Sequence, residues 1–289
     1  MNRQPKPILA PQEDISETLY RSYSGARVSS ADRECQGIDA SQSGALIMNA
    51  DDWGRDQETT KRIFECIRHG TLSSVSAMVF MEDSERAAAV ARESGVDAGL
   101  HLNFTTPFSD PCCSSQLKER QRKVASYLRR HALSKVVFHP GLVRSFEYVF
   151  AAHLDEFRRL YGSSPDRIDG HHHMHLCANV VLGKLLPTGT ITRRNFSFQP
   201  GEKSFANRFY RRALDRRLAR RHRLTDFFFS LSPLKPASRL QRIFTLAYEN
   251  VVEVETHPVH PEEYRFLTGD EISDQLGDLR IASHYALCH

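Results

Sequence analysis

Long apolar runs are missing from this sequence of 289 residues, and their absence sets the first limits on its class. No run approaches the roughly 18 apolar residues that a membrane-spanning helix requires. The N-terminal stretch MNRQPKPILAPQEDISETLYRS holds basic residues but no continuous apolar core, so it predicts no secretory signal. The composition, with 40% hydrophobic and 26% charged residues, is typical of a soluble globular protein. We therefore expect a cytoplasmic location.

Cysteine is scarce and irregularly spaced. The six cysteines form no CxxC pair, and two of them, Cys112 and Cys113, are direct neighbours. In a chain of this length, such spacing argues against a disulfide framework and against a zinc-thiolate site, and it favours reduced thiols. A strong charge of one sign is also missing, because the net charge is only +4 and identifies no partner by itself.

The chain changes character near residue 44. Residues 1–43 are polar and show little apolar periodicity, which predicts a poorly ordered or loosely docked extension. From there to residue 289 we expect a single catalytic domain, because short apolar runs alternate with helical patterns. About seven strands are predicted, in GALIMNADDWG, LSSVSAMVF, VDAGLHLNF, DRIDGHHHMH, GTITRRNF, LTDFFFSL and VVEVETHP. This alternation favours an α/β fold with parallel strands, a TIM-like (β/α) barrel that is closed or nearly closed.

One segment, residues 204–223, interrupts the alternation as an arginine-rich helical insert. It carries eight arginines, and Phe205, Phe209, Ala213 and Leu218 suggest a rough apolar stripe. One interpretation is a solvated helix whose arginine stems cover the barrel. The other is a basic amphipathic helix in peripheral contact with an anionic membrane. No part of the sequence resembles a fold that reads nucleic acid, so we expect no nucleic-acid partner.

Polar side chains gather where the predicted strands end. In parallel α/β folds the loops after the strands converge at one edge, so these groups should meet there. Each group alone has an ordinary explanation, such as a turn, a helix cap or a buried histidine. Together they predict a site, because a shared cation would neutralise carboxylates and use imidazole lone pairs. The residues are Asn49, Asp51 and Asp52; His101 and Asn103; Asp169 and the histidines after it; and Glu255, Thr256 and His257.

The densest signal is RIDGHHHMHL, residues 167–176, with four histidines in five positions. If residues 169–175 are extended, Asp169, His171, His173 and His175 share one face, and His172 points the other way. Neighbours on that face would be roughly 7 Å apart, so one or two histidines could reach a single metal ion. The others would then support the ligands or contact substrate. A solvent-exposed loop with incidental metal affinity is the alternative.

These segments resemble a known family. NADDWG at 49–54, AGLHLNFT at 98–105, IDGHHHMH at 168–175 and VEVETHPVH at 252–260 are similar, in the same order, to motifs of the YdjC-like carbohydrate deacetylases. That family includes chitooligosaccharide deacetylases and hopanoid-biosynthesis deacetylases. The resemblance runs from about Leu46 to about Leu287 and leaves out the N-terminal extension. It implies a (β/α)-barrel-like fold, one divalent metal ion and a possible homodimer.

The resemblance also implies roles for individual residues. Asp52, His101 and His171 match the metal ligands, and Asp51 matches the position of a general base. His257 matches a histidine that could act as a general acid. The family has a substrate-side arginine where this sequence has Arg193 and Arg194, and we assign His173 and His175 to the substrate as well. Trp53 stands where the family usually has phenylalanine.

The implied reaction is removal of the N-acetyl group of an amino sugar or glycoconjugate, with release of acetate. The oxygen and nitrogen ligands suit zinc, cobalt, manganese or iron, and the family is often described with magnesium, so Mg²⁺ and Zn²⁺ are both expected. Two alternatives stay open. One is another metal-dependent hydrolase, either an amidohydrolase or a phosphoesterase, although the latter more often uses two metals. The other is a catalytically idle relative that binds sugar or metal.

Overall fold

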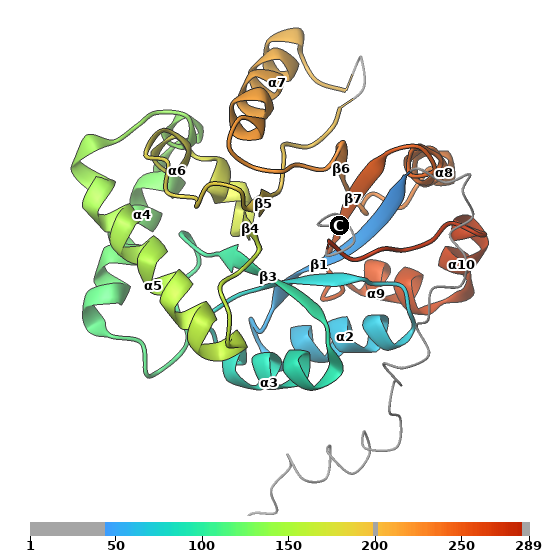
Figure 1. Ribbon diagram of the computed structural model, residues 1–289, viewed down its shortest axis with the longest axis horizontal. Helices are drawn as coiled ribbons and strands as arrows, with labels where there is room; N and C mark the ends of the chain where they lie inside the picture. The colour runs from blue at the N-terminus through green and yellow to red at the C-terminus, as the bar shows by residue number, and fades with distance from the viewer. Residues whose placement is uncertain (1–43, 199–201, 285–289) are drawn as a thin grey trace, which may run out of the picture. The chain divides into compact units, whose positions relative to one another are not determined.

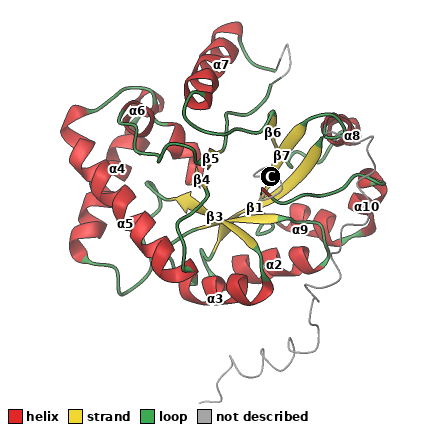
Figure 2. Ribbon diagram, viewed as in Figure 1, coloured by secondary structure: helices red, strands yellow, loops and turns green. Residues whose placement is uncertain are grey.

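The computed structural model describes residues 44–198 and 202–284, so the predicted extension lies outside the described residues. Seven parallel strands form one sheet in the order β5-β4-β3-β2-β1-β7-β6. The sheet curls, and helices lie along its outer side (Figures 1 and 2). The predicted TIM-like α/β barrel is therefore confirmed as an incompletely closed one.

The seven strands match the predicted segments, although several are shorter. They are β1 (Ala45–Trp53), β2 (Ser74–Ala77), β3 (Asp97–Leu102), β4 (Arg167–Gly170), β5 (Ile191–Thr192), β6 (Phe227–Ser230) and β7 (Val251–Thr256). The α-helices are α2 (Gln57–Arg68), α3 (Ser84–Ser94), α4 (Ser115–Arg130), α5 (Val143–Tyr161), α6 (Ala178–Leu182), α7 (Phe205–Ala219), α8 (Ala237–Leu246), α9 (Pro261–Thr268) and α10 (Asp270–Leu276). Short 3₁₀ helices are η1 (Ala132–Lys135), η2 (Pro140–Leu142) and η3 (His171–Leu176).

Strands β5 and β6 are the two edges of the sheet, and single contacts bring them together. The backbone N–H of Thr192 donates to the carbonyl oxygen of Arg223 at 2.9 Å. Further along, the N–H of Ser197 donates to the carbonyl oxygen of Phe228 at 2.8 Å. The chain after β5 therefore closes the gap without extending a regular ladder.

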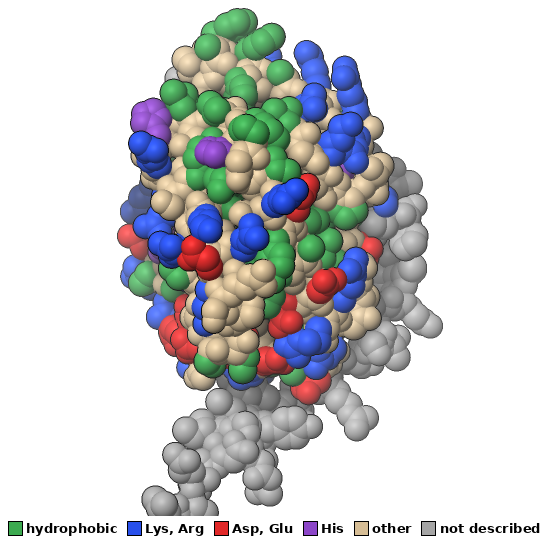
Figure 3. Space-filling model, turned by 90° about the vertical axis from the view of Figure 1, so that its left-hand side faces the viewer, with side chains coloured by type: hydrophobic (Ala, Val, Ile, Leu, Met, Phe, Trp, Pro, Cys, Tyr) green, Lys and Arg blue, Asp and Glu red, His purple; other side chains and the backbone are tan. Residues whose placement is uncertain are grey.

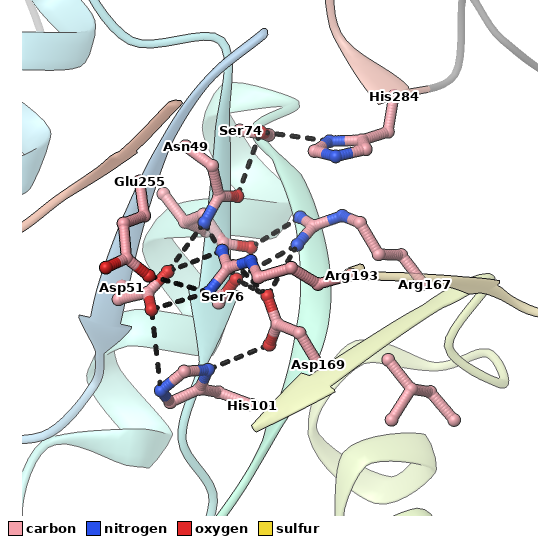
Figure 4. Close-up of polar contacts among 12 residues, drawn as sticks. Asn49, Asp51, Ser74, Ser76, His101, Arg167, Asp169, Arg193, Glu255 and His284 are labelled. Carbon is pink, nitrogen blue, oxygen red and sulfur yellow. Dashed lines mark hydrogen bonds and ion pairs between the residues drawn. The ribbon is translucent and has the colours of Figure 1, made fainter. Parts of the chain in front are cut away.

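Side chains alternate along the strands between two very different environments. The outward positions, such as Met48, Leu100 and Val254, are buried in the hydrophobic core beneath the helices. Most inward positions are polar, although Ile47 and Phe228, which pair in register with Glu253, also face inward. TIM-like barrels usually fill this space with branched apolar side chains. Here it holds Asn49, Asp51, Ser74, Ser76, His101, Arg167, Asp169, Arg193, Glu253, Glu255 and His284 (Figure 4 draws most of them).

The four apolar residues that we expected to form one stripe on the arginine-rich helix do not share one face. Phe205 and Phe209 on α7 are 75% and 62% exposed, whereas Leu218 is buried. Thirteen residues separate Phe205 from Leu218, which places them roughly 140° apart around a helix of 3.6 residues per turn. Figure 3 shows hydrophobic side chains exposed at the level where α7 lies in Figure 1. Among the described residues, no helix has both the length and the apolarity to cross a membrane.

Candidate metal centre

Three side chains from three separate strand ends converge at the carboxyl edge of the sheet. His171 Nδ1 lies 2.9 Å from Asp52 Oδ1, and His101 Nε2 lies 3.5 Å from the same oxygen. One ligand atom from each of the three residues lies within 4.8 Å of the others. All three side chains are buried. The three residues that the sequence suggested as metal ligands are therefore neighbours in space.

A local distortion of β1 makes this convergence possible. In a regular strand, adjacent residues such as Asp51 and Asp52 point to opposite faces. The pairing of β1 with β2 shifts register between Ala50 and Trp53, and Asp52 has a φ of 68°. Aspartate tolerates this left-handed conformation better than most residues. The bulge redirects Asp52 so that both carboxylates serve the same site.

The contacts of Asp52 are suited to holding a cation. Its Oδ1 is buried and accepts no hydrogen bond, although His171 Nδ1 is 2.9 Å away. Two donor atoms about 2.1 Å from one ion would be about 3.0–3.4 Å apart at octahedral or tetrahedral angles. The separations of 2.9 and 3.5 Å bracket that range. One carboxylate and two imidazoles also leave coordination positions open, as a catalytic metal site requires.

His101 is oriented by a carboxylate that the sequence reasoning did not assign. Its Nδ1 lies 2.8 Å from Asp169 Oδ1, so the Nδ1–H donates to Asp169 and Nε2 turns towards Asp52. The other oxygen of Asp169 accepts from the Ser76 hydroxyl at 2.6 Å. A carboxylate behind a ligating histidine fixes the ring and raises its basicity. Asp169 therefore belongs to the site as a positioning residue.

Asp51 forms a bidentate pair with Arg193. Both carboxylate oxygens of Asp51 accept from the guanidinium at 2.7 Å, and the Asn49 amide donates to Oδ1 at 2.8 Å. Burial by itself would raise the pKa of Asp51, but the charges of Arg193 and His101, together with the hydrogen bonding to Arg193, hold that pKa below the usual range. Asp51 therefore stays ionised, with Oδ2 3.9 Å from His101 Nε2.

Arg193 is the hub of the barrel interior, as Figure 4 shows. Its side chain is only 1% exposed. Besides Asp51, it pairs with Asp169 at 2.9 Å, Glu253 at 2.8 Å and Glu255 at 3.4 Å. Burial, followed by the charge of Asp51, raises the pKa of Glu255 well above its ordinary value. The carboxylates around Arg193 outnumber the positive charges, which is a favourable setting for a divalent cation.

The histidine cluster is not extended, and the expected shared face of Asp169, His171, His173 and His175 is wrong. After β4 the chain turns into η3, where His172 and His173 have φ values of 54° and 58°. This turn points His171 at Asp52 and leaves His172 exposed beside the Thr105 hydroxyl, 3.0 Å from its Nδ1. The turn was not visible in the sequence because non-glycine residues rarely adopt a positive φ.

The two histidines that we assigned to the substrate differ in exposure. His175 is fully buried, and its Nε2 lies 3.0 Å from the carbonyl oxygen of Arg193. The side chain of His173 is 30% exposed, and its Nε2 lies 3.7 Å from Glu255 Oε2. Burial lowers the pKa of His175 to about 4 and that of His173 to about 3, so both are neutral at physiological pH.

His257 and Arg194 lie outside the close contacts of this cluster. His257 follows β7, is half-buried, and its backbone N–H donates to Glu263 at 2.6 Å. Arg194 instead contacts the carbonyl oxygens of Thr225 and Asp226, just before β6, and pairs with Asp215 of α7 at 3.2 Å. Its guanidinium therefore lies towards the amino end of β6, away from the carboxyl edge.

The comparisons with known proteins agree with this architecture. Residues 45–286 match the model of the family described as "YdjC-like protein". A crystal structure of a cellobiose-phosphate cleavage protein from Enterococcus faecalis V583 aligns with a TM-score of 0.60 at 19% identity, covering 84% of this chain and 98% of the other. That similarity concerns the fold alone. The barrel and its cluster define an α/β protein with a carboxylate–histidine site, and the chain belongs to the YdjC-like family.

Curated relatives carry deacetylase names. A carbohydrate deacetylase of Clostridium beijerinckii is 26% identical over 220 residues, which cover 74% of this chain and 80% of the relative. A chitooligosaccharide deacetylase of Serratia marcescens is 33% identical over 136 residues, covering 45% and 50%. One from Proteus mirabilis is 31% identical over 131 residues, with the same coverage. For the last two, the aligned part spans about half the length of the relative.

Proposed function

We propose that this protein is a metal-dependent carbohydrate deacetylase that hydrolyses the N-acetyl group of an amino sugar or glycoconjugate. The observation that carries the proposal is the convergence of Asp52, His101 and His171 on one point at the carboxyl edge of the sheet. The names of the curated relatives support the substrate class. The proposal does not depend on the identity of the ion, for which Mg²⁺ and Zn²⁺ are the two candidates.

Asp52, His101 and His171 would hold the ion. When bound, a divalent ion lowers the pKa of water and polarises the acetyl carbonyl, which addresses both the poor nucleophile and the poor electrophile. Asp169 accepts a hydrogen bond from Nδ1–H of His101 at 2.8 Å, which leaves the lone pair of Nε2 available. Arg55, whose guanidinium lies 3.0 Å from Asp52 Oδ2, holds the second oxygen of that carboxylate.

Asp51 is proposed as the group that accepts the proton of the attacking water. Its Oδ2 lies 3.9 Å from the ligand nitrogen of His101, so it is next to the site. Arg193 keeps it ionised and fixes both of its oxygens. The same pairing makes Asp51 a weak base. Each unit by which the pKa of a carboxyl group is lowered makes its protonation about 1.4 kcal/mol less favourable. Arg193, being fully buried, acts on the substrate through Asp51 rather than by direct contact.

His257 is proposed as the donor of a proton to the leaving amine, on the strength of its place after β7 and its partial exposure. His173 is proposed as the cluster histidine that contacts the sugar, because part of its side chain reaches solvent. Its ring lies against Phe196, with 4.7 Å between the centroids. Such aromatic rings provide flat apolar surfaces beside the site.

The test is an acetate-release screen across N-acetylated mono- and oligosaccharides, with and without chelator. We expect release by the metal-loaded protein, loss with chelator, and loss in the His171→Ala variant. His172→Ala is a matched control, because this neighbouring histidine is exposed and not part of the three-residue cluster. Full activity of a correctly folded His171→Ala protein would remove that ligand from the proposal. Release of phosphate from phosphorylated sugars, without acetate, would favour the phosphoesterase alternative.

A further inference from the structure

A cleft of about 290 Å³ lies between the α6 region and the carboxyl end of α7. Its cationic lining consists of Lys184, Arg217, Arg220 and Arg221, and His222 is a further polar residue of the wall. None of the residues that line it is acidic. Figure 3 shows Lys and Arg side chains gathered on the upper part of the face that it draws. The arginine-rich segment, which the proposed deacetylase chemistry does not use, therefore contributes to a concave surface.

The positive charges of this cleft are not neutralised by the protein. Among the described residues, Lys184, Arg217 and Arg220 are in no ion pair within 4.0 Å. The single acid of α7, Asp215, faces the barrel and pairs with Arg194. Clustered cations repel one another, so an uncompensated group of them is stabilised by a bound anion.

Two contacts show that part of the lining is ordered before any ligand binds. The Arg221 guanidinium donates to the Thr188 hydroxyl at 2.9 Å, and the Arg221 carbonyl oxygen accepts from Gly189 at 2.8 Å. His222 is only 8% exposed, and its ring contacts the Pro187 backbone. This part of the wall is therefore formed before any ligand binds.

The rest of the lining is apolar. Val180, Val181, Leu186 and Leu218 complete the wall, and Val180, Leu186 and Leu218 are buried. A fully hydrated inorganic ion would gain little from such a wall, whereas an organic anion could bury its carbon atoms there. A phosphate group suits the cations well, since it carries up to two charges and accepts several hydrogen bonds at once.

We propose that this cleft is a second binding site, which takes a phosphate-bearing organic anion. The phosphate would be bound by Arg217, Arg220 and Lys184, and the carbon portion would lie against Val181, the partly exposed apolar residue of the lining. The cleft is separate from the metal centre. Its last lining residue, His222, directly precedes Arg223, which pairs with Ile191 at the amino end of β5. The carboxylate–histidine cluster lies instead at the carboxyl ends of the strands. The proposal is independent of the deacetylase activity.

The same chemistry is available from two sources, a soluble phosphate ester and the headgroup of an anionic lipid. Isothermal titration with phenyl phosphate and with inorganic phosphate tests the first. Sedimentation with phosphatidylcholine vesicles, with and without phosphatidic acid, tests the second. Both are performed on the full chain at one fixed salt concentration, because such binding depends strongly on salt.

A pair of matched double variants assigns any binding to the cleft. Arg217→Gln/Arg220→Gln removes two cations of the lining, and Arg212→Gln/Arg216→Gln removes two from the same helix outside the lining. Both lose the same charge. We expect the first variant to bind at least tenfold more weakly to whichever probe binds the original protein. The affinity of the second variant should stay within threefold of that of the original protein. Arg217→Lys/Arg220→Lys should recover part of the affinity.

The outcomes separate the sources. Titratable binding of phenyl phosphate that only the cleft variant loses supports a soluble ester. Sedimentation only with phosphatidic acid, lost only in the cleft variant, supports a lipid headgroup. Equal losses in both double variants would show a general charge effect and would overturn the proposal, as would no binding of any probe. Phosphate bound at the metal centre would persist in the cleft variant, so it cannot be mistaken for this site.

Discussion

Asp169 holds His101 from behind, with 2.8 Å between the carboxylate Oδ1 and the ring Nδ1. This pair comes from neighbouring strands, since His101 and Asp169 are partners in the register of β3 and β4. The proton on Nδ1 is thereby fixed, and the lone pair of Nε2 faces Asp52. Replacing Asp169 tests whether this orientation matters for metal binding.

Asp169→Asn should weaken binding of Zn²⁺ or Co²⁺ by about 10–100-fold, as loss of an orienting partner commonly does. The measurement is competition with a chromophoric chelator, alongside circular dichroism to confirm folding. Asp97→Asn is the matched control, because Asp97 is also buried in the barrel but contacts His284, not a proposed ligand. Unchanged metal affinity in folded Asp169→Asn would show that the carboxylate is dispensable.

Asp52→Asn and Asp52→Ala should both lose metal-dependent acetate release, since neither provides a charged ligand. They should differ in stability. Asn tolerates the φ of 68° at this position, whereas Ala in the left-handed region costs about 1–2 kcal/mol. Thermal unfolding with and without added Zn²⁺ checks both points: the original protein should be stabilised by the ion, and the variants far less. An equal metal-induced shift in all three would exclude Asp52 as a ligand.

Arg193→Met should lower the free energy of unfolding by about 3–5 kcal/mol, because it leaves several buried carboxylates without their cation. Urea denaturation followed by fluorescence of Trp53 measures the change. Arg122→Met is the control, since Arg122 pairs with Glu119 on the exposed surface of α4 and should change nothing measurable. A stable Arg193→Met protein would mean that the carboxylates are neutralised in another way.

His153 should make the fold less stable in acid. Its ring is buried, with Nδ1 2.7 Å from the Val149 carbonyl oxygen and Nε2 accepting from the N–H of Asn103. Burial lowers the pKa of His153 to about 4, against about 6.5 in an unfolded chain. Between these values the unfolded state binds more protons, so stability is full above pH 6.5 and falls as the pH drops towards 4.

The contribution of His153 is on the order of 3 kcal/mol at the acid end of that window. His153→Gln should therefore unfold more easily than the original protein at pH 7, with a difference that narrows as the pH falls to 4. Urea titrations across this range provide the comparison. The groups facing the ring are aromatic, Phe80, Phe104 and Phe108, so His153 itself accounts for the change. A constant difference across the range would contradict this explanation.

Gly99→Ala should destabilise the barrel through a direct collision. A Cβ at this position would lie 2.6 Å from Cζ of Arg167, whose guanidinium donates to Ser76 and to the Val75 carbonyl oxygen. We expect a loss of about 1–3 kcal/mol, typical of overpacking. Gly95→Ala is a useful comparison, because nothing lies near its Cβ and its cost of about 1–2 kcal/mol comes from a φ of 67° alone. Thermal unfolding and metal affinity together separate the two effects, since only Gly99 lies in β3, the strand that carries the proposed ligand His101.

The sequence predicted the fold and the edge at which polar side chains meet because both depend on regular features, whereas the choice of Asp52, His101 and His171 as ligands came from the resemblance to the YdjC-like family. Apolar strands that each end in Asp or His must bring those side chains to one edge of a parallel sheet. Periodicity could not reveal the left-handed turn at His172 and His173, since it depends on contacts with distant strands. Phe205 and Leu218 lie on different faces of α7, because their separation of thirteen residues amounts to a rotation of roughly 140°.

The alternation of residues in β7 predicts acidic side chains inside the barrel. In VEVET the hydrophobic and acidic residues alternate, so Glu253 and Glu255 must share a face, and in a barrel that face is the inside. What the alternation does not reveal is the cation that they meet. Arg193 follows a strand of only two residues, so its inward direction depends on the tertiary structure and not on a local pattern.

The irregular backbone at Asp52 has a practical consequence for protein engineering. If the residues of this site were introduced into a regular strand of another barrel, the side chains of Asp51 and Asp52 would point to opposite faces of the sheet. One of them would then face solvent or a helix. A successful graft would have to carry the kink from Ala50 to Trp53 together with the side chains. The shape of the main chain here is as much a part of the site as the groups that it presents.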